Sequence, residues 1–249
     1  MNNKIFIISH QKIDLSPSSQ FPILYVGGNV LNEKADNIYF DNTGDNISKD
    51  NIIFNEMSGV YWAWKNYDEL GNPDNIGFMH YRRLFIFKDS KYAYFSKDES
   101  SKDILNELNY SNEIYNGADF IVPTPYKRLS VQASYNIAHH DIDIPLVLDI
   151  IKELYPNDYE IAKTYVKGKA MYFNNMFIFK KEQFFEYCDW IFPILFKFKE
   201  VSQYKTDRLF ISEILTGIFF KKLMAKGLTP KNFPILFIED KKPSFKESI

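Results

Sequence analysis

Short apolar runs alternate with longer amphipathic segments along most of the chain. The apolar runs are rich in β-branched and aromatic residues and end at polar loops, glycines or prolines, as strands do. They occupy Lys4–Ser9, Pro22–Gly28, Asn75–Met79, Ala118–Pro125 and Tyr172–Lys181. Helical patterns occupy Asn51–Tyr67, Lys102–Asn109, Pro145–Leu154, Glu182–Lys199 with a break before Pro193, and Thr206–Lys226. This alternation predicts an α/β fold with a mostly parallel central sheet flanked by helices.

Length and composition predict one domain over residues 1–249, with a polar, lysine-rich tail from about residue 239. The net charge of -2 argues against nucleic acid as a partner. A lone cysteine excludes an intrachain disulfide and fits a reducing compartment. The first residues do not read as a signal peptide, and no run approaches a membrane span. We therefore expect a cytoplasmic protein, with peripheral membrane contact left open.

The stretch "GFMHYRRLF" places polar groups directly after a strand-like run. His80, Arg82 and Arg83 follow Met79, and arginine forks suit phosphate or carboxylate ligands. Ligands bind at the carboxyl ends of strands in open α/β sheets, so an anion site is expected here. On an extended chain the two arginines point to opposite faces, so one of them would pair inside the protein. The alternative is a surface loop between strands.

The helix pattern over Asn51–Tyr67 predicts one buried face that contains Phe54, Val60 and Trp64. At 100° per residue Trp62 falls on another side of this helix and becomes a candidate stacking surface for a ligand. Burial of Trp62 against a neighbouring loop is the alternative.

Two places carry carboxylates that could act in chemistry. Asp141 and Asp143 form an Asp-x-Asp pair after two histidines, a spacing that can hold Mg²⁺ or Mn²⁺ against a diphosphate. The pair also precedes a helical pattern, and helix capping is the favoured interpretation of Asp143. Glu213 flanks an apolar helix stripe, where burial would raise its pKa and suit it to general base work. A salt bridge with Arg208 or Arg83 is the favoured alternative for Glu213.

Several motif classes are absent from the sequence. It contains no glycine-rich dinucleotide fingerprint, no phosphate loop, no nucleophile elbow and no zincin motif. Nucleotide binding through a glycine-rich loop, serine hydrolase chemistry and zincin chemistry therefore lose support.

Five blocks in order resemble the family catalogued as domain of unknown function 4422. The blocks are "DNTGDNIS", "NEMSGVYWAWKN", "IGFMHYRRLF", "NNMFIFKKEQFFEYCDWIFPIL" and "DRLFISEIL", and the resemblance runs from about residue 4 to residue 225. Members are described as capsular or exopolysaccharide glycosyltransferases, with galactofuranosyltransferase activity attached to the family. The sequence departs from the usual family pattern at Met57, Ser58 and Ile214.

The resemblance implies a GT-A-like domain that transfers galactofuranose from its UDP donor, with inversion, to a lipid-linked or oligosaccharide acceptor of a capsule or O-antigen. In this family "HYRR" occupies the segment that carries the metal-binding Asp-x-Asp of ordinary GT-A enzymes. We therefore expect His80, Arg82 and Arg83 to bind the diphosphate without a required metal or other cofactor. A metal at Asp141 and Asp143 is the disfavoured alternative.

Two groups of residues complete the expected site. Tyr61, Trp62 and Lys65 are candidates for lining the uracil or the sugar, and Asp141, Asp143 and Glu213 are candidate bases. The alternative function is a glycan- or nucleotide-binding module without turnover.

Overall fold

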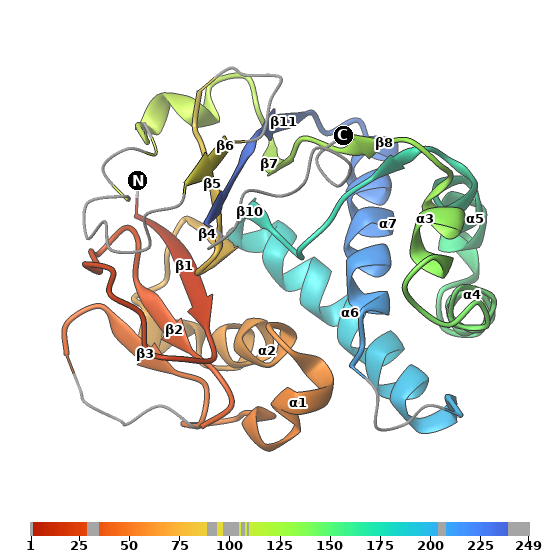
Figure 1. The fold of residues 1–249 in the computed structure, drawn as a ribbon, viewed down its shortest axis with the longest axis horizontal. Helices are drawn as coiled ribbons and strands as arrows, with labels where there is room; N and C mark the ends of the chain where they lie inside the picture. The colour runs from red at the N-terminus through yellow and green to blue at the C-terminus, as the bar shows by residue number, and fades with distance from the viewer. Residues whose placement is uncertain are drawn as a thin grey trace.

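The computed structural model describes residues 2–28, 35–88, 94–96, 105, 108, 110–203 and 208–238. A ten-stranded sheet runs through the centre, with its main path in the order β11-β7-β10-β4-β1-β2-β3 (Figure 1). The strands of this sheet are β1 (Asn3–Ser9), β2 (Ile23–Tyr25), β3 (Ile38–Phe40), β4 (Asn75–His80), β5 (Arg83–Phe85), β6 (Tyr94–Ser96), β7 (Phe120–Pro123), β10 (Phe177–Lys180), β11 (Pro230–Phe233) and β12 (Ile235–Ile238). A second sheet pairs β8 (Tyr126–Lys127) with β9 (Ala170–Met171).

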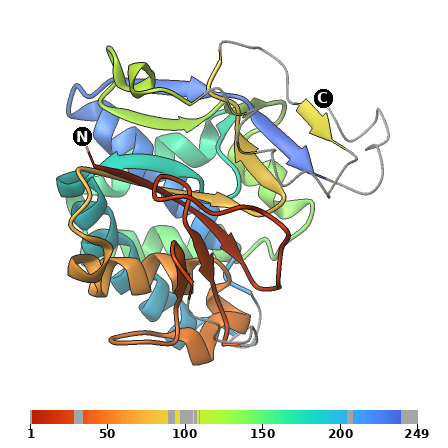
Figure 2. The same ribbon diagram turned by 90° about the vertical axis from the view of Figure 1, so that its left-hand side faces the viewer.

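Helices cover the sheet and extend to one side of it. They are α1 (Asn51–Phe54), α2 (Met57–Lys65), α3 (Val131–Asn136), α4 (Asp143–Leu154), α5 (Tyr159–Lys167), α6 (Lys181–Val201) and α7 (Ile211–Ala225). Short 3-10 turns lie at Ser48–Asp50, Tyr67–Leu70, Asn112–Tyr115 and Pro156–Asp158. Helix α6 packs on β4 and β10, whereas α3, α4 and α5 group on the side farthest from β1–β3 (Figures 1 and 2).

Strands β1–β4 form a parallel part of the sheet. Strand β1 lies parallel to both β2 and β4, and Ile8 of β1 is the partner of His80 of β4. Strand β10 is antiparallel to β4 and β7, so the sheet is mixed but largely parallel in this half. Because β1 and β4 run side by side in one direction, the segments that follow both strands emerge at the same edge. The predicted α/β class with a flanked, mostly parallel sheet is confirmed.

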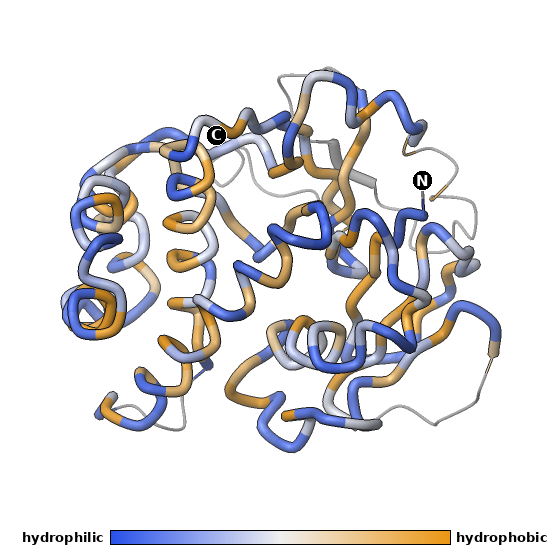
Figure 3. Tube along the Cα trace, turned by 180° about the vertical axis from the view of Figure 1, so that it is seen from behind, coloured by the Kyte–Doolittle hydropathy of each residue, from blue (hydrophilic) through white to orange (hydrophobic). Residues whose placement is uncertain are grey.

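Two hydrophobic cores form on the two sides of the sheet, as alternate residues of a two-sided strand require. In β1, Phe6 and Ile8 join the core under the helices, whereas Ile5 and Ile7 join the core on the opposite side. The orange segments in Figure 3 follow the strands and the inner faces of the long helices.

Helix α6 continues through Pro193, so the break expected there is wrong. A proline leaves the carbonyl of the residue four positions earlier without its helical donor. Here that carbonyl belongs to Asp189, and the hydroxyl of Tyr155 donates to it at 3.0 Å. A side chain from outside the helix thus replaces the lost bond, which explains why the helix is not interrupted.

Trp62 is buried, so its expected place off the core face is wrong. Its side chain is 1% exposed, and its indole N–H donates to the hydroxyl of Thr43 at 3.0 Å. The expectation assumed one buried face, but α2 is buried on two sides: Tyr61 and Trp64 pack on Phe192 of α6, whereas Trp62 packs on Tyr39 of β3. The alternative, burial of Trp62 against a neighbouring loop, is confirmed by its bond to Thr43.

Two other predictions concern parts of the chain outside the described residues: the helix expected at 102–109 falls largely there, and the tail from 239 wholly. The elements that were not predicted are strands β3, β5, β6, β8, β9, β11 and β12, which are only two to four residues long, and helices α3 and α5. Within the described part of the chain, no helix combines the length and the apolar character needed to cross a membrane.

Candidate functional site

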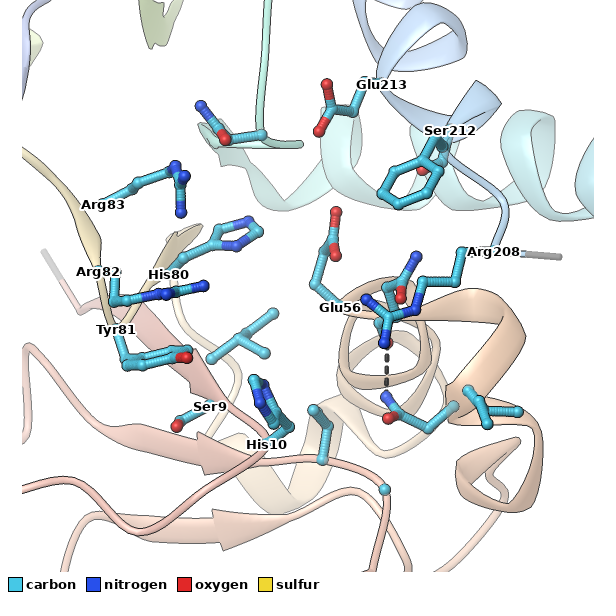
Figure 4. A pocket seen from close by; sticks show the side chains of 18 of the residues that line it. Ser9, His10, Glu56, His80, Tyr81, Arg82, Arg83, Arg208, Ser212 and Glu213 are labelled. Atoms are coloured by element: carbon cyan, nitrogen blue, oxygen red, sulfur yellow. Dashed lines mark hydrogen bonds between the residues drawn. The ribbon is translucent and has the colours of Figure 1, made fainter. Parts of the chain in front are cut away.

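A cavity of about 720 Å³ opens where β1, β2 and β4 end. Parts of the chain that are distant in sequence meet there: the ends of these strands, the start of α2, the turn before β10 and the start of α7 (Figure 4). Its lining comprises Ile8, Ser9, His10, Val26, Gly27, Ser48, Lys49, Asn51, Ile52, Asn55, Glu56, His80, Tyr81, Arg82, Arg83, Asn174, Arg208, Phe210, Ser212 and Glu213. We call it the first cavity.

The "HYRR" stretch forms a tight hairpin between β4 and β5. His80 is paired with Arg83 across the two strands, so Tyr81 and Arg82 make the turn. Because the chain reverses here, both arginines line the first cavity, and the expectation that they point to opposite faces is wrong. The expected position at the carboxyl end of a buried strand is correct, and Figure 4 shows Arg82 and Arg83 on the same side of the cavity.

His80 presents an unpartnered nitrogen at this site. Its Nε2 atom is buried and has no hydrogen-bond partner among the described residues. Burial lowers the pKa of His80, Arg83 and Arg82 lower it further, and Glu56 together with a hydrogen bond to the backbone of Asn174 opposes the shift. A buried nitrogen without a partner is costly unless a ligand supplies one.

Glu213 and Glu56 form a pair of carboxyl groups in the first cavity. Burial raises the pKa of Glu213 to about 8, and the charge of Glu56 adds to the shift. A hydrogen bond from the backbone of Asn174 and the charge of Arg83 act in the opposite direction. In Figure 4 both carboxyl groups point into the cavity. The predicted rise in the pKa of Glu213 is confirmed, whereas Glu56 was not identified from the sequence.

Asn175 fixes the position of Glu56 relative to α7. Its amide nitrogen donates to Oε1 of Glu56 at 2.6 Å and to Oγ of Ser212 at 2.8 Å. Its amide oxygen accepts from Oγ1 of Thr216 at 2.6 Å. The side chain is 2% exposed, so these bonds are formed away from water. Asn174 and Asn175 have φ values of +71° and +46°, a left-handed conformation that asparagine tolerates better than most residues.

A second polar network holds the opposite wall. The carboxylate of Asp41 is fully buried and accepts bonds from Oγ of Ser48 at 2.6 Å, Oγ of Ser58 at 2.6 Å and the backbone of Gly27 at 3.0 Å. Burial raises the pKa of Asp41, and these three bonds offset that rise. The network ties β2, the 3-10 turn at Ser48–Asp50 and α2 together, and it positions two cavity-lining residues.

Two further ionisable side chains, His10 and Arg208, line the cavity and were not predicted as site residues. Burial lowers the pKa of His10, and the charges of Arg82 and Arg208 lower it further. Arg208 had been considered only as a partner for Glu213. In Figure 4 it lies across the cavity from Arg82 and Arg83, with Glu56 between them. No feature of the sequence around His10 marks it as a site residue, because only the parallel pairing of β1 and β4 brings it near Arg82.

Asp141 and Asp143 lie outside the first cavity. Asp141 is exposed, whereas Asp143 is buried in the first turn of α4 and accepts a bond from the hydroxyl of Tyr135 at 2.7 Å. The residue at the cap position of α4 is Ile142, so the favoured capping role of Asp143 is wrong. Asp143 instead lines an adjacent cavity of about 590 Å³. No group of three or more histidine, cysteine or acidic residues suited to a metal ion occurs among the described residues.

Tyr61, Trp62 and Lys65 also lie away from the first cavity. Tyr61 packs edge-on against Phe192, with ring centroids 5.0 Å apart, and Lys65 Nζ lies 3.5 Å from the centre of the Trp64 ring. Tyr61 serves the contact between α2 and α6, whereas Trp62 packs on Tyr39 of β3. The structure thus places "HYRR" and Glu213 in one cavity and does not bring the other predicted residues to it.

The site lies at the carboxyl edge of a largely parallel sheet. It places cations that suit an anionic ligand near a carboxyl group of raised pKa. This arrangement defines an α/β protein with a binding site equipped for proton transfer. The chain belongs to the family described as domain of unknown function (DUF4422), whose model matches residues 4–224. This match confirms the resemblance found in the sequence.

A solved structure shares this fold. The apo structure of the bifunctional glycosyltransferase WbbM aligns with a TM-score of 0.83 at 25% sequence identity. The alignment covers 98% of this chain and 48% of that one, so the chain spans about half the length of WbbM. No curated protein matches the chain.

The amide of Asn175 provides a test of the site's architecture. Asn175→Asp keeps the shape but replaces the donor to Glu56 with a second carboxylate. We expect a loss of about 2 kcal/mol or more in the free energy of unfolding at pH 7.5, measured by urea titration. The loss should shrink at pH 5, where a protonated side chain can donate again.

The matched control is Asn72→Asp. Asn72 also has a positive φ, of 48°, and donates to a carboxylate, Oδ1 of Asp68 at 3.0 Å, but it is exposed. This variant should change the free energy of unfolding by less than about 1 kcal/mol. Equal effects of the two substitutions would contradict the role given to Asn175.

Proposed function

We propose that this protein is a glycosyltransferase that moves a sugar from a UDP donor to a glycan acceptor with inversion at the anomeric carbon. The observation that carries the proposal is the first cavity, in which Arg82 and Arg83 lie beside Glu213, a carboxyl group with a pKa of about 8. The structural likeness to a glycosyltransferase at a TM-score of 0.83 supports the same class.

The hairpin residues bind the diphosphate of the donor in this proposal. Two guanidinium groups supply permanent positive charge and planar donors for phosphate oxygens. A bound diphosphate would also raise the pKa of His80, because an opposite charge favours the protonated ring, and Nε2 would then become a donor. These three side chains neutralise the leaving group without a required metal ion or other cofactor.

Glu213 is the proposed general base. An acceptor hydroxyl oxygen attacks the anomeric carbon, the bond from that carbon to the phosphate oxygen breaks, UDP leaves and the hydroxyl proton passes to the Glu213 carboxylate. A base works best when its pKa lies near the working pH. Glu56 contributes by its charge, which keeps the pKa of Glu213 high.

The finer identity of the substrates rests on the family resemblance. The proposed donor sugar is galactofuranose, and the proposed acceptor is a lipid-linked or oligosaccharide precursor of a capsule or O-antigen. Such precursors are assembled at the inner face of the membrane, so we propose a cytoplasmic protein that makes peripheral contact there.

Calorimetric titration tests the donor site. UDP and UDP-galactofuranose should bind with the same affinity in EDTA as in Mn²⁺, and Arg82→Ala should weaken binding by about tenfold or more, since a hydrogen bond to a charged group is lost. Arg128→Ala is the control, because Arg128 is also exposed but lines neither cavity. Binding that requires Mn²⁺ and survives Arg82→Ala would move the diphosphate site to Asp141 and Asp143.

Carboxylate variants test the base. Glu213→Gln should keep UDP binding and lose about a hundredfold or more of transfer. Glu56→Gln should retain transfer but shift the rising part of the pH–rate profile to lower pH, because the negative neighbour that raises the pKa of Glu213 is gone. Asp141→Asn is the control and should leave both rate and profile unchanged.

Two results would redirect this assignment. If Asp143→Asn abolishes sugar transfer and Glu213→Gln does not, the base would be Asp143 in the adjacent cavity. Donor binding without transfer or hydrolysis under any condition would favour the alternative, a nucleotide- or glycan-binding module without turnover.

A further inference from the structure

A second cavity of about 590 Å³ adjoins the first and has no part in the chemistry described above. It is lined by Ile52, Tyr135, Ala138, His139, His140, Asp143, Phe198, Ser202, Arg208, Leu209 and Phe210. Its lining combines aromatic rings with hydrogen-bonding groups, the mixture typical of small-molecule sites.

Three rings pack against one another in this cavity. The His139 and Phe210 rings lie 4.5 Å apart with 24° between their planes, and the Tyr135 ring lies 4.6 Å from that of His139, tilted by 43°. Burial lowers the pKa of His139, which favours its uncharged form. Flat, uncharged rings beside polar groups suit a sugar, whose C–H face is apolar and whose edge carries hydroxyls.

The two cavities share a wall. Ile52, Arg208 and Phe210 line both of them. The backbone N–H of Glu213 donates to the carbonyl of Phe210 at 3.1 Å, so the proposed base lies one helical turn beyond the shared aromatic residue. A molecule stacked in the second cavity would therefore have its edge directed past Arg208 toward the reacting centre.

We infer that the second cavity is the subsite for the terminal sugar of the acceptor, stacked on the face of Phe210 opposite His139, with its attacking hydroxyl toward Glu213. This inference rests on the proposed glycosyl transfer. Asp143 then serves the acceptor, because its carboxylate, oriented by the Tyr135 hydroxyl at 2.7 Å, is a hydrogen-bond acceptor for sugar hydroxyls.

The rim of the second cavity indicates what the sugar is attached to. Eight large hydrophobic side chains are exposed in the described part of the chain; two of them line this cavity, and three more are adjacent in sequence to a lining residue. These five are Ile52, Ile137, Ile142, Val201 and Phe210. Such a gathering is unusual for a solvated surface and fits an acceptor sugar that carries an apolar chain.

Octyl glycosides of galactose, glucose, mannose, rhamnose and N-acetylglucosamine are suitable probes below their micelle-forming concentrations. Saturation-transfer NMR should show that the sugar protons of at least one of them contact the wild-type protein. His139→Ala should weaken this binding by about tenfold, because one aromatic contact is lost, and Phe210→Ala should weaken it to the same extent. With UDP-galactofuranose as donor, the KM for that glycoside should rise in both variants while kcat stays within about twofold.

Phe196→Ala is the matched control. Phe196 is 40% exposed and Phe210 is 39% exposed, but Phe196 lines neither cavity. His139→Ala should bind UDP with the affinity of the wild-type protein, as measured by calorimetry. This result would show that the variant is folded.

Binding of none of the glycosides, or binding that survives both substitutions unchanged, would overturn the inference. These results are distinct from failure of the proposed function, which would appear as absent UDP binding in the wild-type protein. A glycoside that binds through His139 and Phe210 without receiving sugar would place a saccharide in the second cavity but would overturn its assignment to the acceptor.

Discussion

The buried amide of Asn175 is the contact on which the arrangement of the site depends. One side chain bonds to the start of α2 through Glu56 and to α7 through Ser212 and Thr216. Thr216 in turn is 2.7 Å from the hydroxyl of the buried Tyr187 in α6. Three helices are thus held to the turn before β10 by hydrogen bonds, most of which are buried. A network of this kind is stable only when each member has its partner, so it specifies one geometry.

This geometry forces two carboxyl groups to share a small space. Taking a carboxylate out of water raises its pKa, and a neighbouring negative charge raises it further. Glu213 experiences both effects, whereas Arg83 and the Asn174 backbone moderate them. The cations that suit an anionic ligand therefore also tune the proposed base. A bound diphosphate would offset the charge of these arginines, and the pKa of Glu213 would then rise further. Donor binding would thus make Glu213 a stronger base.

The sequence allowed the α/β class, the strand before "HYRR" and the raised pKa of Glu213 to be predicted, because each depends on a local pattern. Burial of Glu213 followed from its position beside an apolar stripe, and the location of His80 followed from the end of a buried strand. Trp62 was misplaced because α2 is buried on a second side, against Tyr39 of β3, and a single apolar stripe does not report a second buried face. Glu56, His10 and Arg208 were missed because only the pairing of strands and the docking of α7 bring them together. The helix through Pro193 depends on a hydroxyl from Tyr155, which lies 34 residues from the Asp189 carbonyl that it bonds and which no local pattern reveals.

The most direct test of the account is a titration of the carboxyl carbons of ¹³C-glutamate-labelled protein by NMR. The account predicts that one glutamate titrates with a midpoint near the value of about 8 given by its surroundings. This signal should be missing in Glu213→Gln and should move to lower pH in Glu56→Gln. If every glutamate titrated below about 5, near the value for an exposed side chain, this would contradict the close placement of Glu56 and Glu213 on which the proposed chemistry rests.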